Sequence, residues 1–144
     1  LVASAAAKLG FAGPWRVWFW LTYWNSLFPS RQPEDHAQAR AALAAKLREP
    51  GRMDALRTMV GLSKADTEAI VAQSRVPALV VMGTRDPDFK DARAEADWLA
   101  TALSADTLIV EGAGHYPHLE RVDLVAPKLL GFLEKISAPR HAAR

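Results

Sequence analysis

An uninterrupted apolar run, ALVVM at residues 78–82, lies between a proline and a glycine. A strand with one face in water alternates in polarity, whereas a continuous run of this length indicates a strand buried on both faces. A second strand is predicted for TLIV at residues 107–110, which follows a helical pattern over residues 91–104, and another helical pattern covers residues 124–136. The order strand, helix, strand, helix predicts two parallel strands joined by a right-handed crossover. Residues 77–136 are therefore predicted to have an α/β fold.

The first 76 residues show helical patterns and no clear strand. Helices are predicted for residues 34–49 and 52–60, where apolar residues recur at helical spacing. Residues 15–28 are also predicted to be helical, with Pro14 at the first turn, where its missing N–H costs nothing. We expect the aromatic side of this helix to face the strand ends, because exposed indoles would create an aggregation-prone patch. Four tryptophans are concerned, namely Trp15, Trp18, Trp20 and Trp24.

Composition limits the class of protein. Of the 144 residues, 50% are apolar and 24% are charged, which is typical of a globular domain. The absence of cysteine excludes disulfides and thiolate metal sites within these residues and fits a reducing cytoplasm. Arg16, Thr22 and Asn25 interrupt the aromatic stretch, so no membrane span is expected. We therefore expect a cytoplasmic protein with no metal, no cofactor and no membrane partner.

The formal charge of +2 is concentrated at the C-terminus. Lys135, Arg140 and Arg144 contribute +3, so the other residues together carry −1. A nearly neutral body lacks the basic face of a nucleic-acid-binding protein, and we expect no nucleic-acid partner. Residues 137–144 are predicted to be a disordered tail.

Polar residues follow each predicted strand, with GTRD at residues 83–86 and GAGH at residues 112–115. The carboxyl ends of parallel strands meet at one edge of a sheet, and neighbouring strands lie about 4.8 Å apart. A carboxylate of Asp86 is therefore predicted to lie within about 3.5 Å of a ring nitrogen of His115. A neutral imidazole held by such an acceptor can take a proton on its other nitrogen. The spacing thus indicates an acid and a general base.

These two segments carry a resemblance to a known family. The run P-x-L-V-V-x-G-x-x-D, followed by G-x-G-H-x-P, resembles the last two strands of the α/β-hydrolase fold. The resemblance implies that Asp86 is the catalytic acid and His115 the general base. Glu120 matches an acidic position at the start of the family's last helix, and Val122 stands where the family often has proline. The residues of both motifs, together with Phe28-Pro29, are also similar to those of a group of uncharacterised bacterial hydrolases.

The same resemblance implies a domain organisation. Residues 1–76 correspond to the helical cap or lid segment, and residues 77–136 to the C-terminal part of the hydrolase core, with the N-terminal strands absent. Because the cap covers the active site in this family, its aromatic residues are candidates for binding substrate. Trp18 and Trp24 of the cap are expected to do so, together with Tyr116, which follows His115 in the core.

Each site residue has a simpler interpretation. Asp86 could be a turn residue before Pro87, and Asp88 is the rival acid two residues further on. His118 is expected at the rim of a pocket or on the surface. The aromatic stretch could form core or subunit contacts instead of a substrate pocket.

The family's nucleophile, in G-x-S-x-G at a strand-to-helix elbow, has no counterpart before Asp86. The segment GLSKA at residues 61–65 spells a similar pattern, but no buried strand precedes it and no room follows it for a further strand and a cap. We interpret Ser63 instead as a helix N-cap leading into residues 67–74. The oxyanion-hole donors are missing as well, so these 144 residues alone are expected to be inactive.

Three functions remain open at this point. The first is an esterase-like hydrolase that acts on a small to medium apolar ester through Ser, His and Asp, with the Ser upstream. The second is a hydrolase with an Asp nucleophile, like haloalkane dehalogenases or epoxide hydrolases. The third is a non-catalytic, truncated binding module. The missing half implies a longer protein, a complementing N-terminal half in another chain, or a rearranged fold, and a homo-oligomer is also open.

Overall fold

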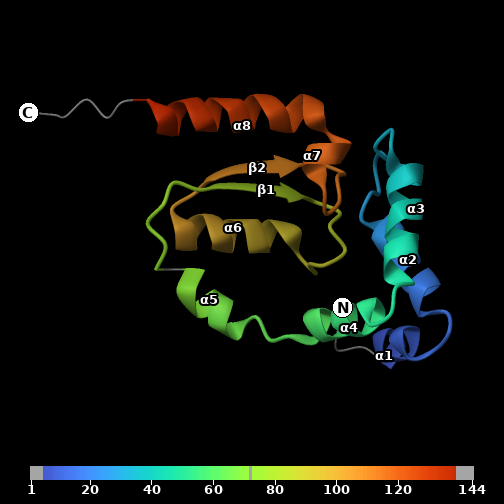
Figure 1. The fold of residues 1–144 in the computed structure, drawn as a ribbon. Helices are drawn as coiled ribbons and strands as arrows, with labels where there is room; N and C mark the ends of the chain where they lie inside the picture. Colours follow the sequence, from blue (N-terminus) through green and yellow to red (C-terminus); the bar gives the residue numbers. More distant parts are fainter. Residues whose placement is uncertain (1–4, 72, 139–144) are drawn as a thin grey trace, which may run out of the picture.

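Among the described residues, helices occupy the first half of the chain and the two strands lie in the second half (Figure 1). The structure is a computed structural model that describes residues 5–71 and 73–138. The elements in chain order are α1 Ala5–Ala12, α2 Arg16–Ser26, α3 His36–Leu47, α4 Arg52–Gly61, α5 Ala65–Val71, β1 Leu79–Gly83, α6 Ala92–Leu103, β2 Asp106–Val110, α7 Pro117–Glu120 and α8 Val122–Ser137.

The two strands are parallel, as predicted, and run in register from the pair Leu79 and Asp106 to the pair Gly83 and Val110. Successive side chains of a strand point to opposite faces, and both faces of β1 are covered. Val80 and Met82 pack with residues of α6, whereas Val81 packs toward α8 with Val110. The prediction of a strand buried on both faces is confirmed.

Helices α6 and α8 lie on opposite faces of this sheet (Figure 1). Helix α6 begins where the side chain of Asp91 accepts a hydrogen bond from the Ala94 N–H at 2.9 Å, which satisfies one of its free N-terminal donors. Helix α8 is long and buries Val125 against the sheet. Several apolar side chains of α8 are nevertheless exposed, among them Leu129, Leu130, Leu133 and Ile136.

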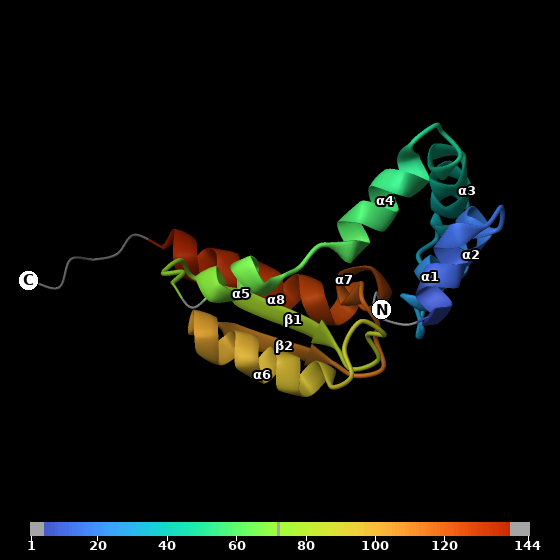
Figure 2. The same cartoon turned by 90° about the horizontal axis from the view of Figure 1, so that it is seen from below.

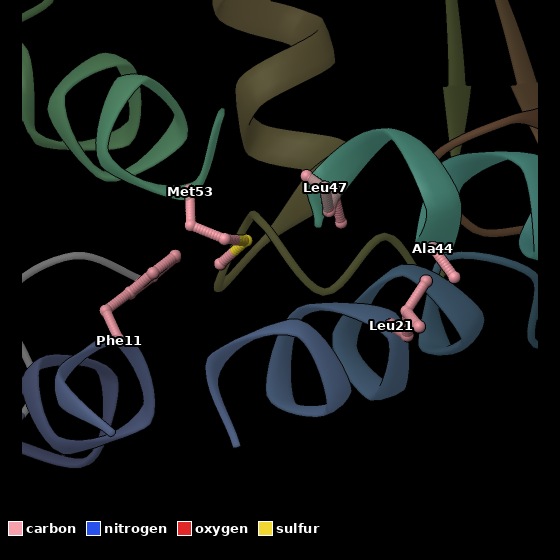
Figure 3. Close-up of a cluster of buried hydrophobic side chains, with 5 residues drawn as sticks. All are labelled: Phe11, Leu21, Ala44, Leu47 and Met53. Carbon is pink, nitrogen blue, oxygen red and sulfur yellow. The ribbon is translucent and has the colours of Figure 1, made fainter. Parts of the chain in front are cut away.

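Helices α1 to α4 form a separate layer beyond the arrowhead ends of the strands, as Figures 1 and 2 show. Their side chains make a small core of their own (Figure 3), which consists of Phe11, Leu21, Ala44, Leu47 and Met53. This layer therefore covers the edge of the sheet at which Asp86 and His115 were expected.

The start of this layer differs from the prediction. Helix α1 was not expected, and Pro14 lies in the turn between α1 and α2 instead of in a first helical turn. The turn is formed by a hydrogen bond from the Arg16 N–H to the Gly13 carbonyl oxygen at 3.2 Å. Pro14 is the second residue of this turn, a position that proline favours as strongly as a first helical turn.

The prediction that the aromatic side of α2 avoids solvent is correct for only half of the indoles. Trp20 and Trp24 are partly buried, whereas Trp15 and Trp18 are exposed, with 65% of Trp18 accessible. The reason is the helical step of about 100° per residue, which places Trp18 about 160° away from Trp20. A single helix face is too narrow to bury all four rings.

Two further expectations concern the chain's end and the membrane. The expected disordered tail begins at Ser137, but that residue is the last of α8, and residues 139–144 lie outside the described residues. None of the helices in the described ranges combines the length and the apolarity that a bilayer crossing requires.

Candidate active site

The loop after β1 carries Asp86 and is joined to the neighbouring loop by backbone hydrogen bonds. The Thr84 N–H donates to the Val110 carbonyl oxygen at 3.2 Å, and the Arg85 N–H donates to that of Ala113 at 2.9 Å. Gly83 is required here by close packing, because a Cβ at this position would lie 2.2 Å from the Gly114 carbonyl oxygen. The absence of a side chain thus lets the two loops approach each other.

His115 lies beside Asp86, as predicted from the strand ends. The Asp86 Oδ2 is 2.9 Å from the His115 Nδ1, which confirms the predicted distance. The Asp86 side chain is 4% exposed and that of His115 is 37% exposed. Because an ionised carboxylate can only accept, this hydrogen bond places the proton on Nδ1 and leaves Nε2 free to accept one. The pair has the geometry of an acid that orients a base.

Asp88 is the second carboxylate beside the histidine. Its Oδ2 is 3.5 Å from the His115 Nδ1, which is longer than the Asp86 contact, and its side chain is 33% exposed. The Asp88 backbone N–H donates to the Asp86 Oδ1 at 2.9 Å and so helps to hold the inner carboxylate in place. Distance and burial both favour Asp86 as the partner of His115.

Tyr23, from helix α2, reaches the same group of acids. Its hydroxyl donates a hydrogen bond to Asp88 Oδ1. Burial raises the pKa of Tyr23, and the hydrogen bond to Asp88 and the negative charges of Asp88 and Asp86 raise it further. The residue was not among the predicted site residues, because an aromatic residue among many aromatics carries no individual signal.

The loop before His115 turns sharply and is held against the helical layer. Gly112 has φ +75°, which favours glycine, and its N–H donates to Thr84 Oγ1 at 2.9 Å. The His115 backbone N–H donates to the Leu27 carbonyl oxygen at 3.0 Å. At Gly114 a Cβ would lie 2.3 Å from that same carbonyl oxygen. The segment after α2 therefore forms one wall of the His115 loop.

Similar solved structures were found for this arrangement. The first is a bromoperoxidase from Bacillus anthracis, with a TM-score of 0.70 and 17% identity, over 90% of this chain and 47% of that chain. The second is an N-acyl homoserine lactone degrading enzyme, with a TM-score of 0.60 and 19% identity, over 90% of this chain and 51% of that chain. Both have the α/β-hydrolase fold.

The chain has the C-terminal part of the α/β-hydrolase fold. It spans about half the length of these two enzymes, so the resemblance noted in the sequence is confirmed for the fold. No protein-family model matches the sequence, and no curated protein matches it.

An aromatic series leads from the cap side of this hydrolase fold to His115. Trp24 packs on Phe28 with ring centroids 5.3 Å apart, and Phe28 stacks on Tyr116 at 5.0 Å. Tyr116 in turn meets the His115 ring edge-to-face at 5.0 Å. Two of the predicted substrate-binding residues, Trp24 and Tyr116, thus belong to one cluster with the histidine.

The remaining predicted residues lie outside this cluster or at its edge. Trp18 is on the exposed side of α2. His118 is exposed, with its ring 6.0 Å from Tyr116, which agrees with a rim position. Ser63 is exposed between α4 and α5 and accepts a hydrogen bond from the Ala65 N–H at 3.2 Å, so its environment is a helix start and not an elbow after a strand.

Glu120 is the most deeply buried charged side chain of the described residues, with 1% exposed. Its Oε1 accepts from the Gly114 N–H at 2.6 Å. Its Oε2 accepts from the Ser30 N–H at 2.8 Å, from Ser30 Oγ at 2.6 Å and from the Arg31 N–H at 3.3 Å. Sequence comparison pointed to the acidic position, but its partner Ser30 could not be read from any pattern.

A metal ion is the alternative occupant to consider at this site. Among the described residues, one group of side chains has the residue types of a metal site, namely Asp86, Asp88 and His115. The possible ligand atoms of these three residues all lie within 4.8 Å of one another. Both oxygens of Asp86 are already used, one by the His115 ring and one by the Asp88 N–H. We therefore interpret the group as an acid and base pair with a supporting carboxylate.

A groove of about 870 Å³ lies between residues 30–35 and 119–123. Neither Asp86 nor His115 lines it, so we place no substrate there.

His36, at the start of α3, is buried with its ring stacked on Trp24, the two ring centroids 4.8 Å apart. Its Nε2 has no hydrogen-bond partner in the described part of the chain.

Proposed function

We propose that this chain supplies the acid and the general base of an esterase-like α/β-hydrolase. One observation carries the proposal, namely the 2.9 Å contact between the buried Asp86 Oδ2 and the His115 Nδ1 at the carboxyl ends of two parallel strands. In open α/β sheets this edge is where ligands bind. The two similar enzymes support the α/β-hydrolase fold on which this proposal is built.

In the proposed reaction His115 acts through Nε2. Asp86 holds the proton on Nδ1, so Nε2 can take the proton of a serine hydroxyl as that oxygen attacks the ester carbonyl carbon. The imidazolium formed in this step is stabilised by the Asp86 carboxylate and then returns the proton to the leaving alcohol. The serine and the N–H donors of the oxyanion hole come, in this proposal, from sequence upstream of these 144 residues.

The proposed substrate is a small to medium apolar ester. Tyr116 contacts the His115 ring, and Phe28 and Trp24 pack behind Tyr116, so this side of His115 is aromatic and suits an uncharged acyl group better than a charged one. One of the similar structures is an N-acyl homoserine lactone degrading enzyme, and a lactone is an internal ester open to the same attack. A lactone therefore belongs among the test substrates.

The proposal includes completion of the sheet by further strands. The two similar enzymes have about twice the length of this chain, and α8 exposes Leu129, Leu130, Leu133 and Ile136. Exposed apolar residues in such number are typical of a surface that another element covers. Two strands also make a sheet of marginal stability without neighbours.

The test uses the complete gene product that contains this chain, a fluorophosphonate probe and p-nitrophenyl esters. We expect labelling of one serine and saturable turnover, with kcat reduced about 10⁴-fold by Asp86→Asn and further by His115→Ala. Asp88→Asn is the matched control, and it should reduce kcat by less than about tenfold because its carboxylate is the more distant one.

Other outcomes favour the other functions. Turnover of a haloalkane or epoxide without fluorophosphonate labelling would indicate an Asp nucleophile, and neither labelling nor turnover would indicate a binding module. The 144-residue chain alone should hydrolyse a p-nitrophenyl ester no faster than free imidazole, and His115→Ala should leave that background unchanged. Saturable turnover by the chain alone would contradict this part of the proposal, and Ser63 would be the first residue to replace.

A further inference from the structure

The Glu120 carboxylate connects two segments that are far apart in the sequence. Oε1 binds the backbone N–H of Gly114, the residue before His115, at 2.6 Å. Oε2 binds Ser30 through both the backbone N–H and the hydroxyl, at 2.8 and 2.6 Å. One buried side chain thus joins the histidine loop to the segment that follows α2.

A carboxylate suits this position. Three of the four groups that point at Glu120 are backbone N–H donors and the fourth is the Ser30 hydroxyl, and a carboxylate offers two acceptor oxygens to them. Hydrogen bonds to an ionised acceptor are also shorter and stronger than neutral ones, which agrees with the 2.6 Å contacts to Gly114 and to Ser30 Oγ. The site therefore depends on the charge of Glu120 as well as on its shape.

The His115 loop is held on three sides. The ring contacts Asp86 at 2.9 Å, the His115 backbone N–H binds the Leu27 carbonyl oxygen at 3.0 Å, and Gly114 binds Glu120. An N–H···O hydrogen bond extends to about 3.2 Å, so the ring contact tolerates a displacement of only about 0.3 Å. A loop that has lost its hydrogen bond to Glu120 can move by more than this tolerated distance.

We propose that Glu120 is a positioning residue, which holds His115 in contact with Asp86 and couples that contact to residues 27–31 of the cap side. Its importance for catalysis rests on the proposed function, in which His115 is the base. Glu120 acts through Gly114 and has no described contact with the imidazole ring itself.

Glu120→Gln tests the charge and keeps the shape. Glutamine has one acceptor oxygen and one NH₂ group, and the oxygen is best placed toward the three donors of Ser30 and Arg31. The NH₂ group then faces the Gly114 N–H, donor against donor, and this hydrogen bond is lost. Glu134→Gln is the matched control, because it removes the same charge from an exposed position on α8.

The measurement is NMR of the 144-residue chain. In Glu120→Gln we expect hydrogen exchange of the Gly114 amide to accelerate about tenfold or more, and the resonance of the proton on His115 Nδ1 to shift or broaden. The Ala96 amide, within α6 in the core against β1, should exchange as in the parent chain, which separates positioning from general loss of stability. Glu134→Gln should change neither signal.

A folded Glu120→Gln chain with unchanged Gly114 exchange and an unchanged His115 resonance would overturn the proposal. If that variant does not fold, Ser30→Ala provides the second test, since Ser30 is exposed and loses a single donor. Ser30→Ala should shift the His115 resonance, although the removed hydroxyl contacts Glu120 and not His115. An unchanged His115 resonance would equally overturn the proposal. Neither readout needs catalysis, so a failure of the proposed function remains distinguishable from a failure of this one.

Discussion

Gly83→Ala is the most direct perturbation of the contact between the two loops. An added Cβ would lie 2.2 Å from the Gly114 carbonyl oxygen and 2.4 Å from that of Ala113. Since such contacts are essentially never shorter than 3.0 Å, the loops must separate by at least 0.8 Å, the difference between 3.0 and 2.2. Backbone atoms provide both contacts, so no side-chain rotation relieves them.

This displacement exceeds what the site can absorb. The Asp86–His115 hydrogen bond of 2.9 Å tolerates about 0.3 Å. The backbone hydrogen bond of 2.9 Å from the Arg85 N–H to the Ala113 carbonyl oxygen resists the same motion. We expect a loss of about 1–3 kcal/mol in the free energy of unfolding, together with a weakened contact between Asp86 and His115.

The assay is urea unfolding combined with the NMR resonance of the proton on His115 Nδ1. Gly131→Ala is the control, because it lies inside α8 with nothing within 4 Å of an added Cβ. It should stabilise the chain by up to about 1 kcal/mol, as expected for glycine to alanine in a helix. A Gly83→Ala chain with the stability and the His115 resonance of the parent would refute the reasoning.

Two other predictions concern helix α2. The pKa of Tyr23 is raised mainly by burial and then by Asp88, so the folded chain keeps this proton at a pH where the unfolded chain, with a tyrosine pKa of about 10, loses it. The free energy of unfolding should therefore fall as the pH rises above about 10. Urea unfolding at a series of pH values measures this fall, and Tyr23→Phe should make it shallower. The same pH dependence in both chains would contradict this prediction. Trp24→Ala should reduce the free energy of unfolding by about 2–3 kcal/mol, since the ring packs on Phe28 and His36, whereas Trp18→Ala should change it by less than about 0.5 kcal/mol. An equal loss of unfolding free energy in the two variants would contradict this prediction, because it would show that the Trp18 ring is packed as well as the Trp24 ring.

Local pattern was sufficient for the elements that carry the site. The apolar run at residues 78–82 predicted β1, because burial on both faces leaves no polar residue in that strand, and the segment at residues 107–110 predicted β2. Once the strands are parallel, their ends must meet, which is why Asp86 and His115 could be predicted as a pair. The placement of Pro14 in a first helical turn was wrong, because proline also suits the second position of a turn and the sequence does not distinguish the two.

Tertiary structure alone decided which groups surround that pair. The motif favoured Asp86 over its rival Asp88, but only the packing of the loop places one at 2.9 Å and the other at 3.5 Å from the His115 Nδ1. Tyr23 meets Asp88 across 65 residues, and Ser30 meets Glu120 across 90. A periodic pattern shows which face of a helix is apolar, but the contacts between a helical layer and two loops depend on how their surfaces pack, and no short-range pattern contains that information.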